Sequence, residues 1–246
     1  MLDQDKAVEH LTRAIAANPK DTTSRFNRGE AYLWQHKYDE ALADFSAVIE
    51  AEPGRIEALQ DRGQVLVNLQ RYDEAILDLD RAIAAKPGDY YARKARARAY
   101  RGKQDLLSEL DERTAVLRLR PRDKDAYLAR GEVHEMLGQY DAAITDYSAV
   151  LTLDPRDRDG RMRRALSLIA LEKFGPALAD IAVLIEKNGP NADTLNARGL
   201  CFQGLGRIDE AITDYSTAIE ATPAAEPGYR RRASAYIDKG DFAAAL

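Results

Sequence analysis

The fold is decided by the stretch Lys124–Asp157, which reads KDAYLARGEVHEMLGQYDAAITDYSAVLTLDPRD. Small and apolar residues recur at a spacing of three or four through its first half, which predicts an amphipathic helix. Gly138 breaks this helix. A second apolar series follows, with Asp141 as its expected N-cap and Pro155 as its end. The stretch is therefore expected to form a helix, a turn and a second helix.

The same pattern recurs every 34 residues without insertion. Small residues hold the eighth and, with one exception, the twentieth position of each copy, and proline usually holds the thirty-second. Such a period indicates stacked helical units, each of which contacts only its neighbours. The expected copies begin at Thr22, Ile56, Tyr90, Lys124, Arg158, Ala192 and Glu226.

These features together resemble the tetratricopeptide repeat (TPR) family. The resemblance covers essentially the whole chain and implies an all-α fold, a right-handed α-α superhelical solenoid of helix–turn–helix repeats. It predicts one solenoid over residues 1–246. Its parts are the second helix of a partial repeat (1–21), full repeats (22–55, 56–89, 90–123, 124–157, 158–191, 192–225) and a further partial repeat (226–246).

Both ends of the pattern are cut within a repeat. Residues 1–21 match a second helix, and residues 242–246 match the beginning of another second helix. Solenoids normally carry polar capping units at their ends. The sequence therefore predicts a piece of a longer chain, or ends that a partner covers.

Charge and hydropathy narrow the function classes. The formal net charge of −5 argues against general binding to nucleic acid or to anionic membranes. No apolar run approaches the ~20 residues that a membrane span requires, and no signal peptide is visible. These features favour a cytoplasmic protein. The Ala-, Arg- and Asp-rich repeats suggest a bacterial source.

Repeat three, residues 90–123, departs most from the pattern. Glu109 holds the small twentieth position and Arg113 a core position, so its second helix is expected to shift and to start at Asp105. In the regular repeats the N-cap of the second helix is assigned to Asp39, Asp73, Asp141 and Asp209.

A ladder of ion pairs is predicted along the repeats. Arginine holds the seventh position of every copy, from Arg28 to Arg232, and an acid holds the twenty-third, from Asp44 to Asp214. We expect these groups to pair between antiparallel helices. If exposed, each pair would contribute about 0–1 kcal/mol.

No constellation for catalysis, metal binding or a cofactor is found. His134 holds a core position that is aromatic in four other copies, and no partner histidine follows at zinc-site spacing. Cys201 lies in a column of small residues, which favours a buried inert thiol over a nucleophile. We therefore expect no enzyme activity, no metal and no cofactor.

The resemblance implies that the first helices line a concave groove. Its expected partner-binding residues are Phe26, Leu33, Trp34, Tyr91, Lys94, Arg98, Arg101, Met136, Met162, Leu166, Ile169 and Leu200. The basic residues of repeat three form one stripe that suits a carboxylate or phosphate on an extended peptide. An ordinary solvated face explains the same charges. The stripe Met162, Leu166 and Ile169 is the apolar candidate.

The sequence thus predicts a non-catalytic scaffold that binds a peptide segment or partner protein in its groove. The Lys/Asn clamp of the TPR proteins that bind chaperone tails is missing at the matching positions, so we do not predict that ligand. Two alternatives remain open. The first is the substrate-recruiting arm of a larger enzyme, and the second is a structural protein that self-associates through its open ends.

Overall fold

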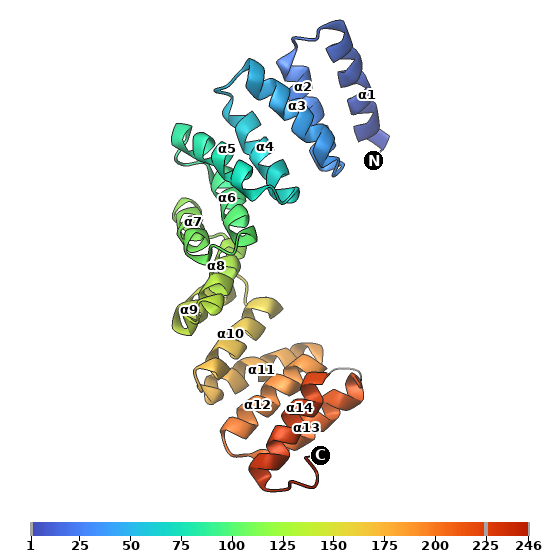
Figure 1. The fold of residues 1–246 in the computed structure, drawn as a ribbon. Helices are drawn as coiled ribbons and strands as arrows, with labels where there is room; N and C mark the ends of the chain where they lie inside the picture. The colour runs from blue at the N-terminus through green and yellow to red at the C-terminus, as the bar shows by residue number, and fades with distance from the viewer. Residues whose placement is uncertain (1, 224–225, 246) are drawn as a thin grey trace. The chain divides into compact units, whose positions relative to one another are not determined.

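The computed structural model of the protein describes residues 2–223 and 226–245. These residues form fourteen α-helices and no strand, which confirms the predicted all-α repeat solenoid (Figure 1). The helices are α1 (Leu2–Ala17), α2 (Thr22–Trp34), α3 (Tyr38–Ala51), α4 (Ile56–Asn68), α5 (Tyr72–Ala85), α6 (Tyr90–Gly102), α7 (Leu106–Leu119), α8 (Lys124–Met136), α9 (Tyr140–Leu153), α10 (Arg158–Ala170), α11 (Phe174–Asn188), α12 (Ala192–Gly204), α13 (Ile208–Ala221) and α14 (Glu226–Lys239).

The chain divides into two compact units, Met1–Pro121 and Arg122–Leu246. In the first, α2 packs on α3, α4 on α5 and α6 on α7, and each first helix also contacts the next first helix. In the second unit α8 packs on α9, α10 on α11 and α12 on α13, and α12 contacts both α10 and α14. An ion pair between Glu132 and Arg163 joins α8 to α10. The first helices of each unit therefore lie side by side and share one face. A single solenoid with the limits given above stays a prediction, and its limits at residues 1, 225 and 246 lie outside the described residues.

The core of each regular repeat is a contact between the eighth and twenty-fourth positions. Tyr147 lies fully buried against Gly131, where a Cβ atom would come within 2.6 Å of the ring. Leu79 fills the same place against Gly63 in repeat two. A small eighth residue is thus required because the larger side chain occupies the space that a Cβ would need.

The predicted ion ladder is present. Arg28 donates to both carboxylate oxygens of Asp44 at 2.7 Å, and the same bidentate geometry recurs at the pair Arg164 and Asp180. The pairs of this ladder are Arg28–Asp44, Arg62–Asp78, Arg96–Glu112, Arg130–Asp146, Arg164–Asp180 and Arg198–Asp214.

The acidic side chains of the ladder are buried. Asp44 is 4 % exposed and Asp146 2 %. Removing a single arginine would strand a buried carboxylate, at a cost of about 3 kcal/mol. The hydrogen bond from Arg28 to Asp44 also raises the pKa of the guanidinium. The value of 0–1 kcal/mol that applies to exposed pairs is therefore too small here.

The ladder continues into the preceding repeat. The third guanidinium nitrogen of Arg62, Nη1, donates to Ser46 at 3.2 Å, and that of Arg164 donates to Ser148 at 3.1 Å. These serines lie sixteen residues before the arginine, as the paired acids lie sixteen residues after it. Each of these arginines therefore links two repeats.

The N-cap prediction is wrong for the second helices. The N-cap of α3 is Lys37, without a side-chain hydrogen bond, and Asp39 lies within the first turn. There its negative charge still interacts favourably with the positive end of the helix dipole. Three aspartates of this set, Asp73, Asp141 and Asp209, also pair with a lysine of the next repeat, as Asp141 does with Lys173 at 2.8 Å. Side-chain caps precede five of the first helices instead, at Asp21, Asp89, Asp123, Asp157 and Asn191.

The second helix of repeat three is not shifted, which corrects that prediction. It starts at Leu106, the seventeenth position, like the second helices of the other full repeats, and Asp105 is its N-cap. Glu109 stays at the core position, fully buried, and accepts from Arg113 at 3.0 Å and from Arg101 at 2.6 Å. A buried ion cluster therefore replaces the apolar contact, and no shift is needed.

The turn between paired helices requires a left-handed residue at the fifteenth position. Gly138 and Gly206 occupy it with φ of 70° and 74°, while His36 and Gln70 adopt φ of 58° and 60°. Such φ values cost least for glycine. His36 therefore lies in the turn between α2 and α3.

The end of the chain differs from its prediction. Residues 242–245 form a turn after α14 and not the start of a second helix, and Leu246 lies outside the described residues. A single turn fixes several dihedral angles for very few hydrogen bonds, which makes it unfavourable as a helix by itself.

Candidate functional site

The first unit carries two adjoining cavities on the face of its first helices. The larger has a volume of about 520 Å³ and the smaller about 230 Å³, and they share Asp61, Gln64 and Arg98. We call them together the first groove. Its further lining residues are Glu30, Leu33, Trp34, His36, Tyr38, Gln60, Asn68, Tyr91, Lys94 and Ala95.

Aromatic side chains mark both ends of the first groove. Trp34 ends α2 and is 73 % exposed, and Tyr91 lies in the first turn of α6 and is 59 % exposed. Exposed rings of this size beside a cavity are typical of binding surfaces, because they bury a large area at low cost in side-chain entropy.

The cations of the first groove have weak or neutral partners. Arg98 donates to the amide oxygen of Asn68 at 3.0 Å, and Lys94 lies 3.4 Å from the Tyr90 hydroxyl. Neither contact neutralises the charge, so both groups keep their capacity to pair with an anion.

Asp61 is the strongest electrostatic feature of the first groove. It is half-buried, and its carboxylate has neither a hydrogen bond nor an ion pair with any residue that the structure describes. Burial raises its pKa to about 7, and the negative charges of Glu30, Glu57 and Asp89 add to the shift. Burial likewise raises the pKa of Glu30, against the opposing charge of Arg55. The larger cavity therefore contains two uncompensated carboxyl groups.

Two predicted residues of the first unit lie outside the groove. Phe26 packs into the core, with its ring 5.6 Å from that of Phe45 and under the Arg55 guanidinium. Arg101 turns inward to Glu109. The predicted basic stripe is therefore reduced to Lys94 and Arg98, because a buried carboxylate on the neighbouring helix attracts the third cation.

The second unit has its own cavity of about 280 Å³ on the first helices, which we call the second groove. The predicted residues Met162, Leu166 and Leu200 meet there, beside Asn196 and Arg231. Leu166 is 43 % exposed. The apolar part of this groove is therefore aliphatic, whereas the first groove carries aromatic rings.

The other predicted residues of the second unit do not join this cavity. Ile169 packs against the core of repeat five. Met136 is 55 % exposed on α8 and is not part of the cavity lining. Between α8 and α10, Arg163 pairs with Glu132 at 2.8 Å and with Glu135 at 3.2 Å. Charges on this part of the surface are thus satisfied internally.

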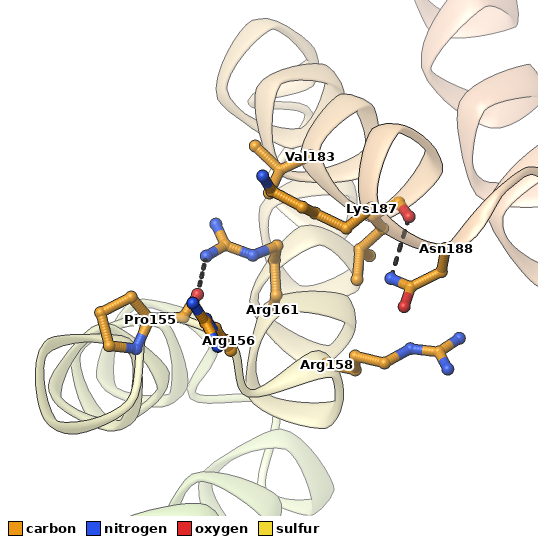
Figure 2. Close-up of a pocket in the computed structure, with 8 residues that line it drawn as sticks. Pro155, Arg156, Arg158, Arg161, Val183, Lys187 and Asn188 are labelled. Atoms are coloured by element: carbon orange, nitrogen blue, oxygen red, sulfur yellow. Dashed lines mark hydrogen bonds between the residues drawn. The ribbon is translucent and has the colours of Figure 1, made fainter.

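A basic pocket of about 280 Å³ lies away from the second groove, between the α9–α10 turn and the end of α11 (Figure 2). Its cations are Arg156, Arg158, Arg161 and Lys187. Figure 2 shows the Arg161 guanidinium turned toward the Pro155 carbonyl, to which it donates at 2.6 Å.

The contact of Arg161 is part of the repeat architecture. Arg25 and Arg93 make the same contact with the carbonyls of Pro19 and Pro87, at 3.1 and 3.0 Å. This recurrence favours a structural role for Arg161 over a ligand-binding one, and the first groove is the better candidate site.

The single cysteine is held in the core, whereas His134 is only partly buried. The thiol of Cys201 is fully buried, and burial raises its pKa to about 11, so it is uncharged at neutral pH. His134 faces inward as predicted, with a ring nitrogen 2.7 Å from the Gln139 amide oxygen. Among the described residues no group of three or more His, Cys, Asp or Glu side chains is placed to hold a metal ion.

Sequence profiles of one family match the chain throughout this architecture. One tetratricopeptide repeat profile matches residues 3–56, 114–158 and 162–226, which is more than half of the chain, and a second matches residues 33–99. The chain belongs to the tetratricopeptide repeat family. The resemblance seen in the sequence is thereby confirmed.

Solved TPR structures share this fold. A tetratricopeptide repeat protein from Parabacteroides merdae is 22 % identical and superposes with a TM-score of 0.62, over 95 % of this chain and 92 % of that one. The C-terminal part of a TPR protein from Cytophaga hutchinsonii is 17 % identical, with a TM-score of 0.78 over 93 % and 94 % of the two chains.

A third similar structure is YrrB, described as a TPR protein with an unusual peptide-binding site. It is 20 % identical, with a TM-score of 0.67 over 78 % of this chain and 98 % of that one. No curated protein matches the sequence. Of the TPR helices that the structure describes, none combines the length and the apolar character needed to cross a bilayer.

Proposed function

We propose that this TPR chain is a non-catalytic adaptor that holds an extended segment of a partner protein in the first groove. One observation carries the proposal. Two adjoining cavities run across α2, α4 and α6 and combine an exposed indole, at Trp34, with charged groups that lack a charged partner. Extended peptides bind to such surfaces through an aromatic anchor and a few polar contacts.

The composition of the first groove supports a peptide over a small metabolite. Its cavities extend across three helices and are lined by aromatic, acidic, basic and amide side chains. An extended segment with several kinds of side chain can contact groups of all these types. YrrB, which shares the fold, is described as having a peptide-binding site, and this also supports the proposal.

Self-association is a second candidate, favoured by a separate observation. Exposed apolar residues gather near the C-terminal end of the second unit, where Tyr229 is 43 %, Ile237 53 % and Phe242 67 % exposed. Light scattering over a hundredfold concentration range tests it. A molar mass that rises with concentration supports this candidate, and a constant monomer mass contradicts it.

The adaptor proposal is tested by selection of peptides from a displayed random library. Selected peptides are measured against the wild-type protein, Arg98→Glu in the first groove and Leu77→Ala as a matched control. Leu77 is exposed on α5, a second helix, outside the groove. We expect Arg98→Glu to weaken binding at least about tenfold, the effect of losing one charge-assisted contact. Equal binding to all three proteins, or no enriched peptide, would contradict the proposal.

A further inference from the structure

The larger cavity of the first groove contains two carboxyl groups, those of Glu30 and Asp61, that no cation neutralises. Arg55 is the cation whose charge lowers the pKa of Glu30, but its guanidinium pairs with Glu52 at 3.4 Å and lies over the Phe26 ring. Arg98 lines the same cavity and keeps its positive charge, but it is directed to Asn68, and no cation is among the groups that shift the pKa of Asp61. The two carboxyl groups outnumber this one cation, so the net charge of the groups that line the cavity is negative.

The other charged groups around Asp61 do not offset this balance. Glu57 and Asp89 add negative charge, and Asp89 is itself occupied as the N-cap of α6 and by Lys86 at 3.4 Å. Lys94 lines only the smaller cavity, where it contacts the Tyr90 hydroxyl. His36 lies in the same cavity, with a ring nitrogen 2.9 Å from the Tyr38 hydroxyl. A further positive charge near Asp61 would thus be favourable.

The second unit shows which side chains occupy the positions of Glu30 and Asp61 in another pair of repeats. Glu30 and Asp61 hold the ninth position of one repeat and the sixth position of the next. Glu132 and Arg163 hold the same two positions in repeats four and five, and there they form an ion pair of 2.8 Å. The geometry of neighbouring first helices therefore brings these two positions within reach of a salt bridge. In the first groove the acid is present and the basic partner is missing.

We propose that the cation missing between Glu30 and Asp61 is supplied by a lysine or arginine side chain of the bound peptide segment. This inference rests on the proposed function of the first groove. The cation enters the larger cavity, pairs with the two carboxylates and lies beside the Trp34 indole, whose π face also attracts cations. It takes the electrostatic place that Arg163 holds in the second unit.

A small peptide probe tests this directly. Trp34 is the only tryptophan of the sequence, so its fluorescence reports on this cavity alone. The probe is acetyl-Ala-Arg-Ala-Ala-amide, and the same peptide with neutral citrulline in place of arginine is its matched control. We expect a saturable change with the arginine peptide and binding at least about tenfold weaker with citrulline, because the ion pair is lost. Equal affinity for the two peptides would overturn the inference.

Variants at Asp61 sharpen the test. Asp61→Asn should weaken binding of the arginine peptide about tenfold. Asp61→Arg should abolish it, because the new side chain would pair with Glu30 as Arg163 does with Glu132. The urea midpoint of both variants verifies folding, and we expect it to equal or exceed the wild-type value. A folded Asp61→Arg protein that still binds the arginine peptide would overturn the inference.

The pH dependence gives an independent readout. Ionised Asp61 is needed for pairing, so the affinity should rise from pH 6 to pH 8, by up to about tenfold for a group of pKa about 7. Asp61→Asn should remove this rise. His36→Gln, which places at position fifteen the residue that Gln70 already provides in repeat two, should preserve it. A rise that persists in Asp61→Asn would contradict the inference.

The outcomes also separate this inference from the adaptor proposal. Selected peptides that depend on Arg98 but carry no lysine or arginine would support the adaptor proposal and overturn the cation site. An arginine peptide that binds at Asp61, with no peptide selected from the library, would support the cation site and contradict the adaptor proposal.

Discussion

In repeat two the space between the paired helices holds Leu79 against Gly63, whereas in repeat three the same space holds the Arg113 guanidinium and the Glu109 carboxylate. The helices start at the same repeat positions in both. The comparison shows that the fold requires this space to be filled and its polar groups to be paired, and does not require it to be apolar. The two solutions should nevertheless respond differently to mutation.

The largest effect is expected where the ion cluster of repeat three is broken from one side. Glu109→Ala removes the acceptor of Arg101 and Arg113, and leaves a guanidinium that is only 8 % exposed without its counter-ion. We expect a loss of about 3 kcal/mol in the free energy of unfolding, measured by urea denaturation. Asp111→Ala, at an exposed position of the same helix, is the control. Equal effects of the two substitutions would show that the cluster is not needed.

A smaller effect is expected where the apolar contact of repeat two is overfilled. Gly63→Leu places a Cβ about 2.6 Å from Leu79 Cγ, so the helices must separate. The expected cost is about 2 kcal/mol in the free energy of unfolding. Gly54→Leu is the matched control, because a Cβ there meets no atom within 4 Å. Equal urea midpoints for the two variants would contradict this account of the eighth position.

The smallest effect is expected when repeat three is given the chemistry of repeat two. The triple substitution Arg101→Val, Glu109→Ala and Arg113→Leu removes all members of the cluster at once. Replacing a whole buried ion cluster by apolar residues avoids its desolvation cost, so stability should stay within about 1 kcal/mol of wild type or increase. Thermal and urea unfolding measure it. A loss as large as that of Glu109→Ala would mean that the two solutions are not interchangeable.

The repeat architecture could be predicted from the sequence because its determinants recur. The small residues at positions eight and twenty, and the opposite charges at positions seven and twenty-three, appear in register from copy to copy, and each copy confirms the others. The cap assignment failed because Asp39 and the cap position are two residues apart, a distance within the usual error of helix limits. The expected shift in repeat three failed because Glu109 found buried partners.

The groove was only partly predictable. Family positions indicate which side of a first helix faces the groove, and Leu33, Trp34, Tyr91, Lys94 and Arg98 lie there. They do not indicate which charges find partners inside the protein, as Arg101 does. Asp61 was missed because the sixth position of the repeat is not among those that line the groove in the TPR family. The signal lay in comparing that position between repeats, where Asp61 stands in place of Arg163.

The arginine ladder has a consequence for how such a chain can grow or shrink. Arg62 and Arg164 each bond sixteen residues forward and sixteen residues back, so the joint between neighbouring repeats is the same at both places. Duplication or excision of exactly one period would recreate a matching joint at the seam, whereas any other length would misalign it. The protein can thus be lengthened in whole modules, and each added module would extend the recognition surface by one further helix.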